Sequence, residues 1–208
     1  MNFNSTRLAA TILGLSLALS SSLLQAQANL VANPGFESNG GSYDLWTLTA
    51  ATDGYGFADV DLGGLTAHEG GHYFGFAATG NQPDVLSQVV PVVASVTYDI
   101  QFSLNTAGVA GTISAAFNGQ TLLNLSNVNL TSATDANGWA NFDYKVTTPS
   151  SLSGGAQLTF SGLSKTGVVG LDSVSVSVVP EPANLSVVAA SLLLGGVLAG
   201  RRSGWFRK

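Results

Sequence analysis

The feature that most constrains the fold is a two-residue alternation of apolar and polar side chains across much of residues 29–178. Residues 96–104 (VTYDIQFSL) place an apolar side chain at every second position, and residues 173–178 alternate serine with valine. This period is typical of strands that bury one face. Asn118-Gly119 separates two such runs and favours a hairpin turn, because both turn positions need positive φ. With no long stretch of helical periodicity, the pattern predicts an all-β sandwich.

The expected strands follow one another closely and are punctuated by Gly, Asn and Pro. They lie at residues 84–90, 96–104, 111–117, 120–125, 141–147, 156–160 and 168–178. Pro83 and Pro91 bound the first of them, which predicts an edge strand or a crossing there. Residues 67–76 are expected to form a turn that enters a strand.

Composition limits the chemistry of this domain. The chain has no cysteine, which excludes a thiol nucleophile, a disulfide framework and a cysteine metal site. Between residues 29 and 178, two lysines oppose eleven carboxylates, a net charge of about −9 that argues against nucleic-acid binding. About 150 residues suffice to bury a core without disulfides, so the region is expected to be one domain.

The N-terminus has the pattern of a secretory signal peptide. Arg7 precedes an apolar, serine-rich run over residues 8–24, and Ala26-Gln27-Ala28 fits the small-x-small cleavage pattern. Residues 1–28 are therefore the expected signal peptide, with cleavage specified by Ala26 and Ala28 and a mature chain starting at Asn29. A two-span membrane protein is the alternative, which the serines in the first run disfavour.

The last thirty residues combine three different segments. Residues 179–182 (VPEP) form a rigid spacer, residues 183–200 are uncharged and apolar, and residues 201–208 (RRSGWFRK) are basic. The apolar segment approaches the roughly 20 residues that span a bilayer as a helix. The basic end is expected to stay on the cytoplasmic side, which places the preceding domain outside. A core strand or helix is the alternative for residues 183–200.

This order of segments resembles the C-terminal sorting signal of bacterial PEP-CTERM proteins. In that family a membrane enzyme, exosortase, recognises the tail and is thought to process it near the Pro-Glu-Pro motif. The resemblance implies that an exosortase-like enzyme is a partner and that residues 179–208 are its substrate. The residues that carry the motif are Val179, Pro180, Glu181, Pro182, Arg201 and Arg202.

The central domain carries a second resemblance. Its short motifs are residues 29–37 (NLVANPGFE), 45–47 (LWT), 86–89 (LSQV), 98–102 (YDIQF) and 171–176 (LDSVSV). Together they resemble the galactose-binding-like jelly rolls found in many carbohydrate-binding modules. The resemblance implies a jelly-roll β-sandwich and a carbohydrate ligand.

The same resemblance implies a structural calcium ion. In that family the opening glutamate and the closing aspartate often contribute to the site, and by position these are Glu37 and Asp172. Calcium prefers several hard oxygen ligands, which terminal strands could bring together. The alternative is that both carboxylates cap strand ends.

One catalytic motif requires separate weighing. His68-Glu69-Gly70-Gly71-His72 has the HExxH spacing with which zinc peptidases place two histidines on one face of a helix. Gly70-Gly71 would cost such a helix roughly 2 kcal/mol relative to alanine. Neither usual third ligand follows, because position 78 is alanine and the next glutamate is Glu181. A zinc hydrolase is therefore only a remote alternative, and we predict a domain that is not an enzyme.

Sugar binding would require exposed aromatic side chains or convergent hydrogen-bonding groups. Tyr55, between two glycines, and Trp139, after Asn137-Gly138, are the aromatic residues expected to be exposed, whereas Trp46 is expected in the core. We therefore expect an exported protein, anchored in the membrane through its C-terminus and then placed at the cell envelope or outside the cell. Its domain would bind carbohydrate or contribute to an extracellular polysaccharide matrix. The alternative is a structural or adhesive surface protein without glycan specificity.

Overall fold

The computed structural model describes residues 27–51, 56–59, 65–130 and 135–180. Within it, Ala28–Val179 form one compact unit with its own hydrophobic core. Most of the expected signal peptide and the apolar segment 183–200 lie outside the described residues. In the part of the chain that is described, no helix is long and apolar enough to cross a membrane.

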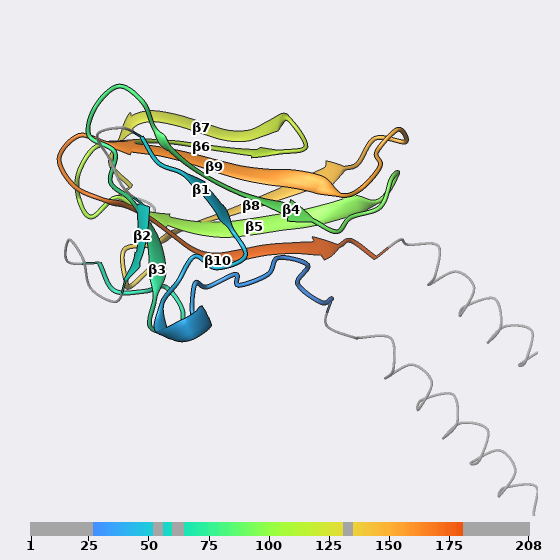
Figure 1. The fold of residues 1–208 in the computed structure, drawn as a ribbon, viewed down its shortest axis with the longest axis horizontal. Helices are drawn as coiled ribbons and strands as arrows, with labels where there is room; N and C mark the ends of the chain where they lie inside the picture. The colour runs from blue at the N-terminus through green and yellow to red at the C-terminus, as the bar shows by residue number, and fades with distance from the viewer. Residues whose placement is uncertain (1–26, 52–55, 60–64, 131–134, 181–208) are drawn as a thin grey trace, which may run out of the picture. The chain divides into compact units, whose positions relative to one another are not determined.

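In the described residues, ten strands form two antiparallel five-stranded sheets, and the alternating pattern predicts such an all-β sandwich (Figure 1). The first sheet has the order β1 (Thr47–Thr49), β4 (Asp84–Val90), β9 (Ala156–Ser164), β6 (Gly111–Phe117) and β7 (Gln120–Val128). The second sheet has the order β2 (Gly56–Asp59), β3 (Tyr73–Phe76), β10 (Val169–Val178), β5 (Thr97–Asn105) and β8 (Ala140–Thr147). A short 3₁₀ helix, η2 (Ser38–Gly40), precedes β1.

Of the two alternatives for residues 84–90, the edge position is wrong and the crossing is confirmed, because β4 lies in the first sheet whereas β3 and β5 lie in the second. β4 lies between β1 and β9, and Val85–Ser87 pair with the short edge strand β1. Pro83 and Pro91 fall just outside the hydrogen-bonded ladder, so neither interrupts it.

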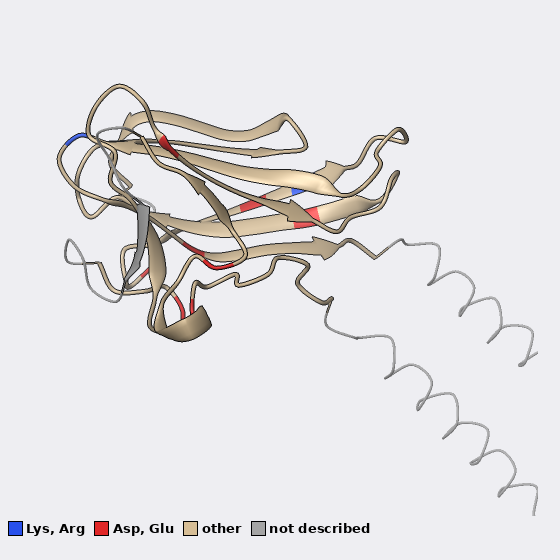
Figure 2. Ribbon diagram, viewed as in Figure 1, with Lys and Arg blue, Asp and Glu red and all other residues tan. Residues whose placement is uncertain are grey.

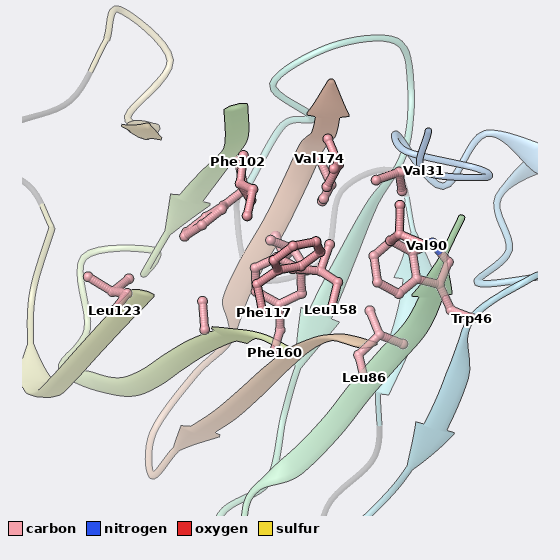
Figure 3. Close-up of a cluster of buried hydrophobic side chains, with 14 of the residues drawn as sticks. Val31, Trp46, Leu86, Val90, Phe102, Phe117, Leu123, Leu158, Phe160 and Val174 are labelled. Carbon is pink, nitrogen blue, oxygen red and sulfur yellow. The ribbon is translucent and has the colours of Figure 1, made fainter. Parts of the chain in front are cut away.

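The core fills the space between the inward faces of the two sheets (Figure 3). Phe160 of β9 lies at its centre, with ring centroids 5.1 Å from Phe102 of β5 and 6.2 Å from Trp46. All three side chains are buried, so the expectation of a core Trp46 is confirmed. Aromatic pairs at these separations add to the stabilisation from buried area.

β10 pairs with β5 on one side, and on its other side its neighbour changes halfway along its length. Val169–Leu171 pair with β3, a bulge follows between Asp172 and Ser175, and the N-terminal segment then lies beside the strand. There the Leu30 amide donates to the Val176 carbonyl at 2.8 Å, and the Val176 amide donates to Asn29 Oδ1 at 3.1 Å. The start and the end of the domain therefore meet at the second sheet.

Charge is distributed unequally between the two sheets (Figure 2). The strands of the first sheet carry a single charged residue, Asp84, whose buried carboxylate accepts the amides of Ala51 and Ala77. The second sheet exposes Asp143 and Lys145 on β8. The outer faces of the two sheets therefore offer different chemistry to a ligand.

Candidate functional site: a cleft over the second sheet

A cleft of about 550 Å³ lies on the outer face of β10, β5 and β8. Its floor follows from alternation: Phe102 turns into the core, whereas its neighbours Gln101 and Ser103 line the cleft. Asn141 and Asp143 of β8 line it in the same way. Strand register places Ser103 opposite Asn141 and Gln101 opposite Asp143.

The floor is made of amides, hydroxyls and carboxylates. Ser103 Oγ donates to Asn141 Oδ1 at 2.6 Å, and Gln101 Nε2 donates to Asp99 Oδ2 at 2.9 Å. The first bond links β5 to β8 and the second runs along β5, and both fix side chains that form the floor. Such a preorganised polar surface is suited to hydrogen-bonding a hydroxyl-rich ligand.

His68 lies at one end of the cleft and joins three segments. Its Nδ1 lies 2.8 Å from Ser173 Oγ, its Nε2 lies 3.2 Å from Asp135 Oδ2, and its ring packs edge-on against Trp139. The hydrogen bond from the Trp139 amide, with further help from His68, holds the pKa of Asp135 below its ordinary value. An ionised Asp135 favours the tautomer with the proton on Nε2, which leaves Nδ1 to accept from Ser173.

The chain Ser173–His68–Asp135 has the order of a hydrolytic triad but differs from one in two respects. The ring nitrogens are reversed, because a triad histidine faces serine with Nε2 and the acid with Nδ1. The Ser173 amide also donates to its neighbour Asp172 at 2.6 Å, which occupies a natural oxyanion donor. We interpret His68 as a positioning residue for the end of the cleft.

Asp172 holds the first half of the 68–72 loop. Its buried carboxylate accepts the amides of His68 at 2.8 Å and Glu69 at 3.2 Å, besides that of Ser173. Burial raises the pKa of Asp172 to about 6, although the three hydrogen bonds oppose it.

Glu37 holds the second half of the same loop. Its Oε1 accepts the amides of Gly71 at 2.7 Å and His72 at 2.8 Å, and its Oε2 lies 2.8 Å from His72 Nδ1. Burial raises the pKa of Glu37, but hydrogen bonds from His72 and Gly71 outweigh it and leave the pKa below its ordinary value. Gly70 has φ 65°, which favours glycine, and an added Cβ would lie 2.2 Å from Glu37 Oε1, so a side chain there would displace the carboxylate that holds the loop.

The HExxH stretch forms the expected turn into a strand. Residues 68–71 are bends and turns, and β3 begins at Tyr73. His68 and His72 contact different partners, Ser173 and Glu37 respectively. Among the described residues, no three His, Cys, Asp or Glu side chains are grouped to hold a metal ion.

Glu37 and Asp172, the residues expected to bind calcium, do lie near each other. An added Cβ at Gly35 would lie 3.6 Å from Asp172 Oδ1 and 3.8 Å from Glu37 Cγ, so both side chains flank this glycine. Their hard oxygens fit calcium in type, and backbone carbonyls or water would have to supply the remaining ligands.

The expectation that Trp139 is exposed is wrong. The ring is completely buried over Gly170 with Leu65 and Tyr73, and its Nε1 donates to the Thr66 carbonyl at 2.9 Å. An added Cβ at Gly170 would lie 2.8 Å from the ring, so a glycine in the second sheet makes room for the indole. Trp139 therefore supports the cleft from within, and Tyr55 lies outside the described residues.

The cleft residues themselves were not singled out from the sequence. Gln101, Ser103, Asn141 and Asp143 all occupy the polar positions of predicted alternating strands. That alternation indicates which residues face outward, but only the sheet order places β5 beside β8.

No family model matches the chain, and no curated protein is significantly similar to it. Solved structures share its fold. One is a carbohydrate-binding module, TmCBM61, in complex with β-1,4-galactotriose: 18% identity, TM-score 0.54, covering 73% of this chain and 99% of that one. Another is the enzymatically active domain of bacteriophage CBA120 tailspike protein 4: 14% identity, TM-score 0.52, 73% of this chain but only 21% of that one. A third contains the CBM22-1 and GH10 modules of Clostridium thermocellum endo-1,4-β-D-xylanase 10B in complex with xylohexaose. It has 14% identity and a TM-score of 0.50, and the match covers 75% of this chain and 29% of that one. The chain thus has a fold seen in carbohydrate-binding modules.

The raised pKa of Asp172 predicts a stability that depends on pH in calcium-free buffer. Between the ordinary pKa of 3.8 and the folded value of about 6, the folded protein holds a proton that the unfolded chain has released. The free energy of unfolding should therefore fall as pH rises through this window, by on the order of 3 kcal/mol. Urea unfolding at a series of pH values measures the fall, and Asp172→Asn should flatten it.

Direct titration of the wild-type protein tests the same prediction even if the Asp172→Asn variant fails to fold. The carboxyl carbon resonance of Asp172 should titrate in the native protein with a midpoint near 6. A midpoint at or below the ordinary value would show that the three hydrogen bonds outweigh burial.

Proposed function

We propose that the sandwich is a non-catalytic module that binds polysaccharide in the cleft over β10, β5 and β8. The observation that carries the proposal is the polar floor, where side chains from adjacent strands converge on a cleft of about 550 Å³. The fold shared with a galactotriose-binding module is consistent with it.

The floor favours hydrogen bonding over aromatic stacking. Of the two aromatic residues in the lining, Phe102 is buried and Phe142 is half-buried, with its ring stacked 5.4 Å from Phe102. Gln101 and Asn141 are exposed and offer amide donors and acceptors. Such a cleft suits a flexible or single glycan chain that presents hydroxyl groups to it.

A panel of polysaccharides in affinity electrophoresis tests this proposal on residues 28–179, the compact unit that contains both sheets and the core. At least one polysaccharide should retard the protein, and Gln101→Ala with Asn141→Ala should weaken that binding about tenfold or more, because two hydrogen-bonding groups are lost. Asn124→Ala, an exposed amide on β7 of the first sheet, is the matched control and should leave binding unchanged.

Free migration in every gel would instead support the structural or adhesive alternative. Equal retardation of the cleft variant and the wild-type protein would place glycan binding elsewhere on the surface.

We propose also that Glu37 and Asp172 hold one structural calcium ion. The support is their position on either side of Gly35 and the hard-oxygen chemistry of two carboxylates. An ion bound there would add electrostatic attraction between the N-terminal segment and β10.

Calcium at about one hundred times its dissociation constant should raise the melting temperature of residues 28–179 by roughly 5–10 °C. Chelation should reverse the shift, and Asp172→Asn should abolish it. The control is Asp44→Asn, which removes an exposed carboxylate elsewhere. An unchanged melting temperature in the wild-type protein would contradict the calcium proposal.

The termini suggest export and sorting. We propose that residues 1–28 direct export, that residues 183–200 anchor the exported chain, and that an exosortase-like enzyme processes it near Pro180-Glu181-Pro182. The chain would then reach the cell envelope or the surrounding matrix. The support is the sequence order of the three tail segments, and Pro180 is exposed at the end of the sandwich.

Replacing Pro180, Glu181 and Pro182 by alanine should block processing, so the chain should accumulate in the membrane fraction at its unprocessed mass. Ser153→Ala, in an exposed loop, is the control. Fractionation of cells and mass spectrometry of the tail make the measurement. Normal release of the alanine variant would refute the role of the motif.

A further inference from the structure

The lining of the cleft is acidic. Glu69 lies at the end beside His68, and Asp143 lies on the floor from β8; both residues are exposed. Among the residues that the structure describes, those that line the cleft include neither lysine nor arginine. A ligand in the cleft therefore meets carboxylates without a compensating lysine or arginine in its walls.

The nearest lysine on the same sheet is already engaged. Lys145 Nζ lies 3.2 Å from Asp99 Oδ1 and 3.8 Å from Asp143 Oδ1, so one ammonium serves two carboxylates. A hydrogen bond with Asp99 raises the pKa of Asp143, with smaller contributions from desolvation and from repulsion between the two carboxylates, and the charge of Lys145 opposes this rise. Two carboxylates thus share one ammonium, which leaves an excess of negative charge beside the floor.

We infer that the cleft selects polysaccharides with free amino groups, such as de-N-acetylated hexosamine polymers, over neutral chains and above all over uronic acid chains. This inference rests on the proposed glycan binding of the cleft and adds the chemistry of the preferred sugar. A sugar ammonium donates charge-assisted hydrogen bonds to Asp143 and Glu69. A uronate adds a further negative charge to the acidic lining and is repelled.

The hydroxyl and amide groups of the floor separate this ligand from other cations. Ser103, Asn141 and Gln101 offer hydrogen bonds to sugar hydroxyls that a linear polyamine lacks. The carboxylates therefore favour a positively charged ligand, and the hydroxyl and amide groups of the floor favour a ligand that is a sugar chain.

Titration calorimetry on residues 28–179 tests the inference with oligosaccharides of equal length, slightly below neutral pH. The probes are oligomers of glucosamine, of N-acetylglucosamine and of galacturonic acid, with spermine as a cation without hydroxyls. The glucosamine oligomer should bind at least about tenfold more tightly than the other three.

Two variants locate the effect. Asp143→Asn should weaken glucosamine binding about tenfold and leave N-acetylglucosamine binding nearly unchanged, because only the ammonium uses the charge. Glu69→Gln should act in the same direction. Asp44→Asn removes an equal charge outside the cleft and should have little effect. Circular dichroism confirms that each variant is folded.

Each other outcome overturns the inference in a distinguishable way. If the acetylated or uronic acid oligomer binds as tightly as the glucosamine oligomer, the selectivity is refuted while glycan binding stands. If Asp44→Asn weakens binding as much as Asp143→Asn, or if spermine competes equally, the attraction comes from net charge alone. If no oligosaccharide binds, and none of the polysaccharides retards the protein in electrophoresis, the inference and the proposed function fail together.

Discussion

The bulge in β10 is the constraint on which the rest of the site depends. β10 is the central strand of the second sheet, and at the bulge Ser173 adopts φ 51° while the Val174 amide donates to the Pro34 carbonyl at 3.0 Å. A bulge redirects the side chains that follow it. Here it aims Asp172 at the 68–72 loop and leaves Ser173 and Ser175 in the cleft. One local irregularity thus shapes the β10 side of the cleft and positions the loop at its end.

The 68–72 loop at the end of the cleft is held by hydrogen bonds to side-chain carboxylates and not by backbone hydrogen bonds of a strand ladder. Glu37 and Asp172 together accept four of its amides, those of residues 68, 69, 71 and 72. Burial of Asp172 raises the cost of its charge by more than the hydrogen bonds from His68, Glu69 and Ser173 lower it, so the pKa of Asp172 stays raised. The same two carboxylates are the proposed calcium ligands, and a cation there would favour the ionised form that the loop amides also need.

The sequence predicts the sandwich better than its site. Residues 111–117 and 120–125 alternate on either side of Asn118-Gly119, so local pattern alone locates the β6–β7 hairpin. Trp139 also follows a loop signal, yet its ring is buried over Gly170. The sequence does not predict this burial, because the space over Gly170 forms only when β10 pairs with β3. The cleft fails to appear in the sequence for the same reason: its floor joins strands that are distant in sequence.

Asp143 shows how one residue can meet two separate demands. β8 is an edge strand, and exposed charges such as Asp143 and Lys145 discourage pairing with another chain. The same position lines the cleft, so a charge that protects the edge also shapes what the cleft attracts. Edge protection alone would be served equally well by a lysine at position 143. Lys145, whose Nζ lies 3.8 Å from Asp143 Oδ1, also favours an acid at this position. The sign of the charge thus suits the ion pair at the strand edge as well as the proposed ammonium ligand.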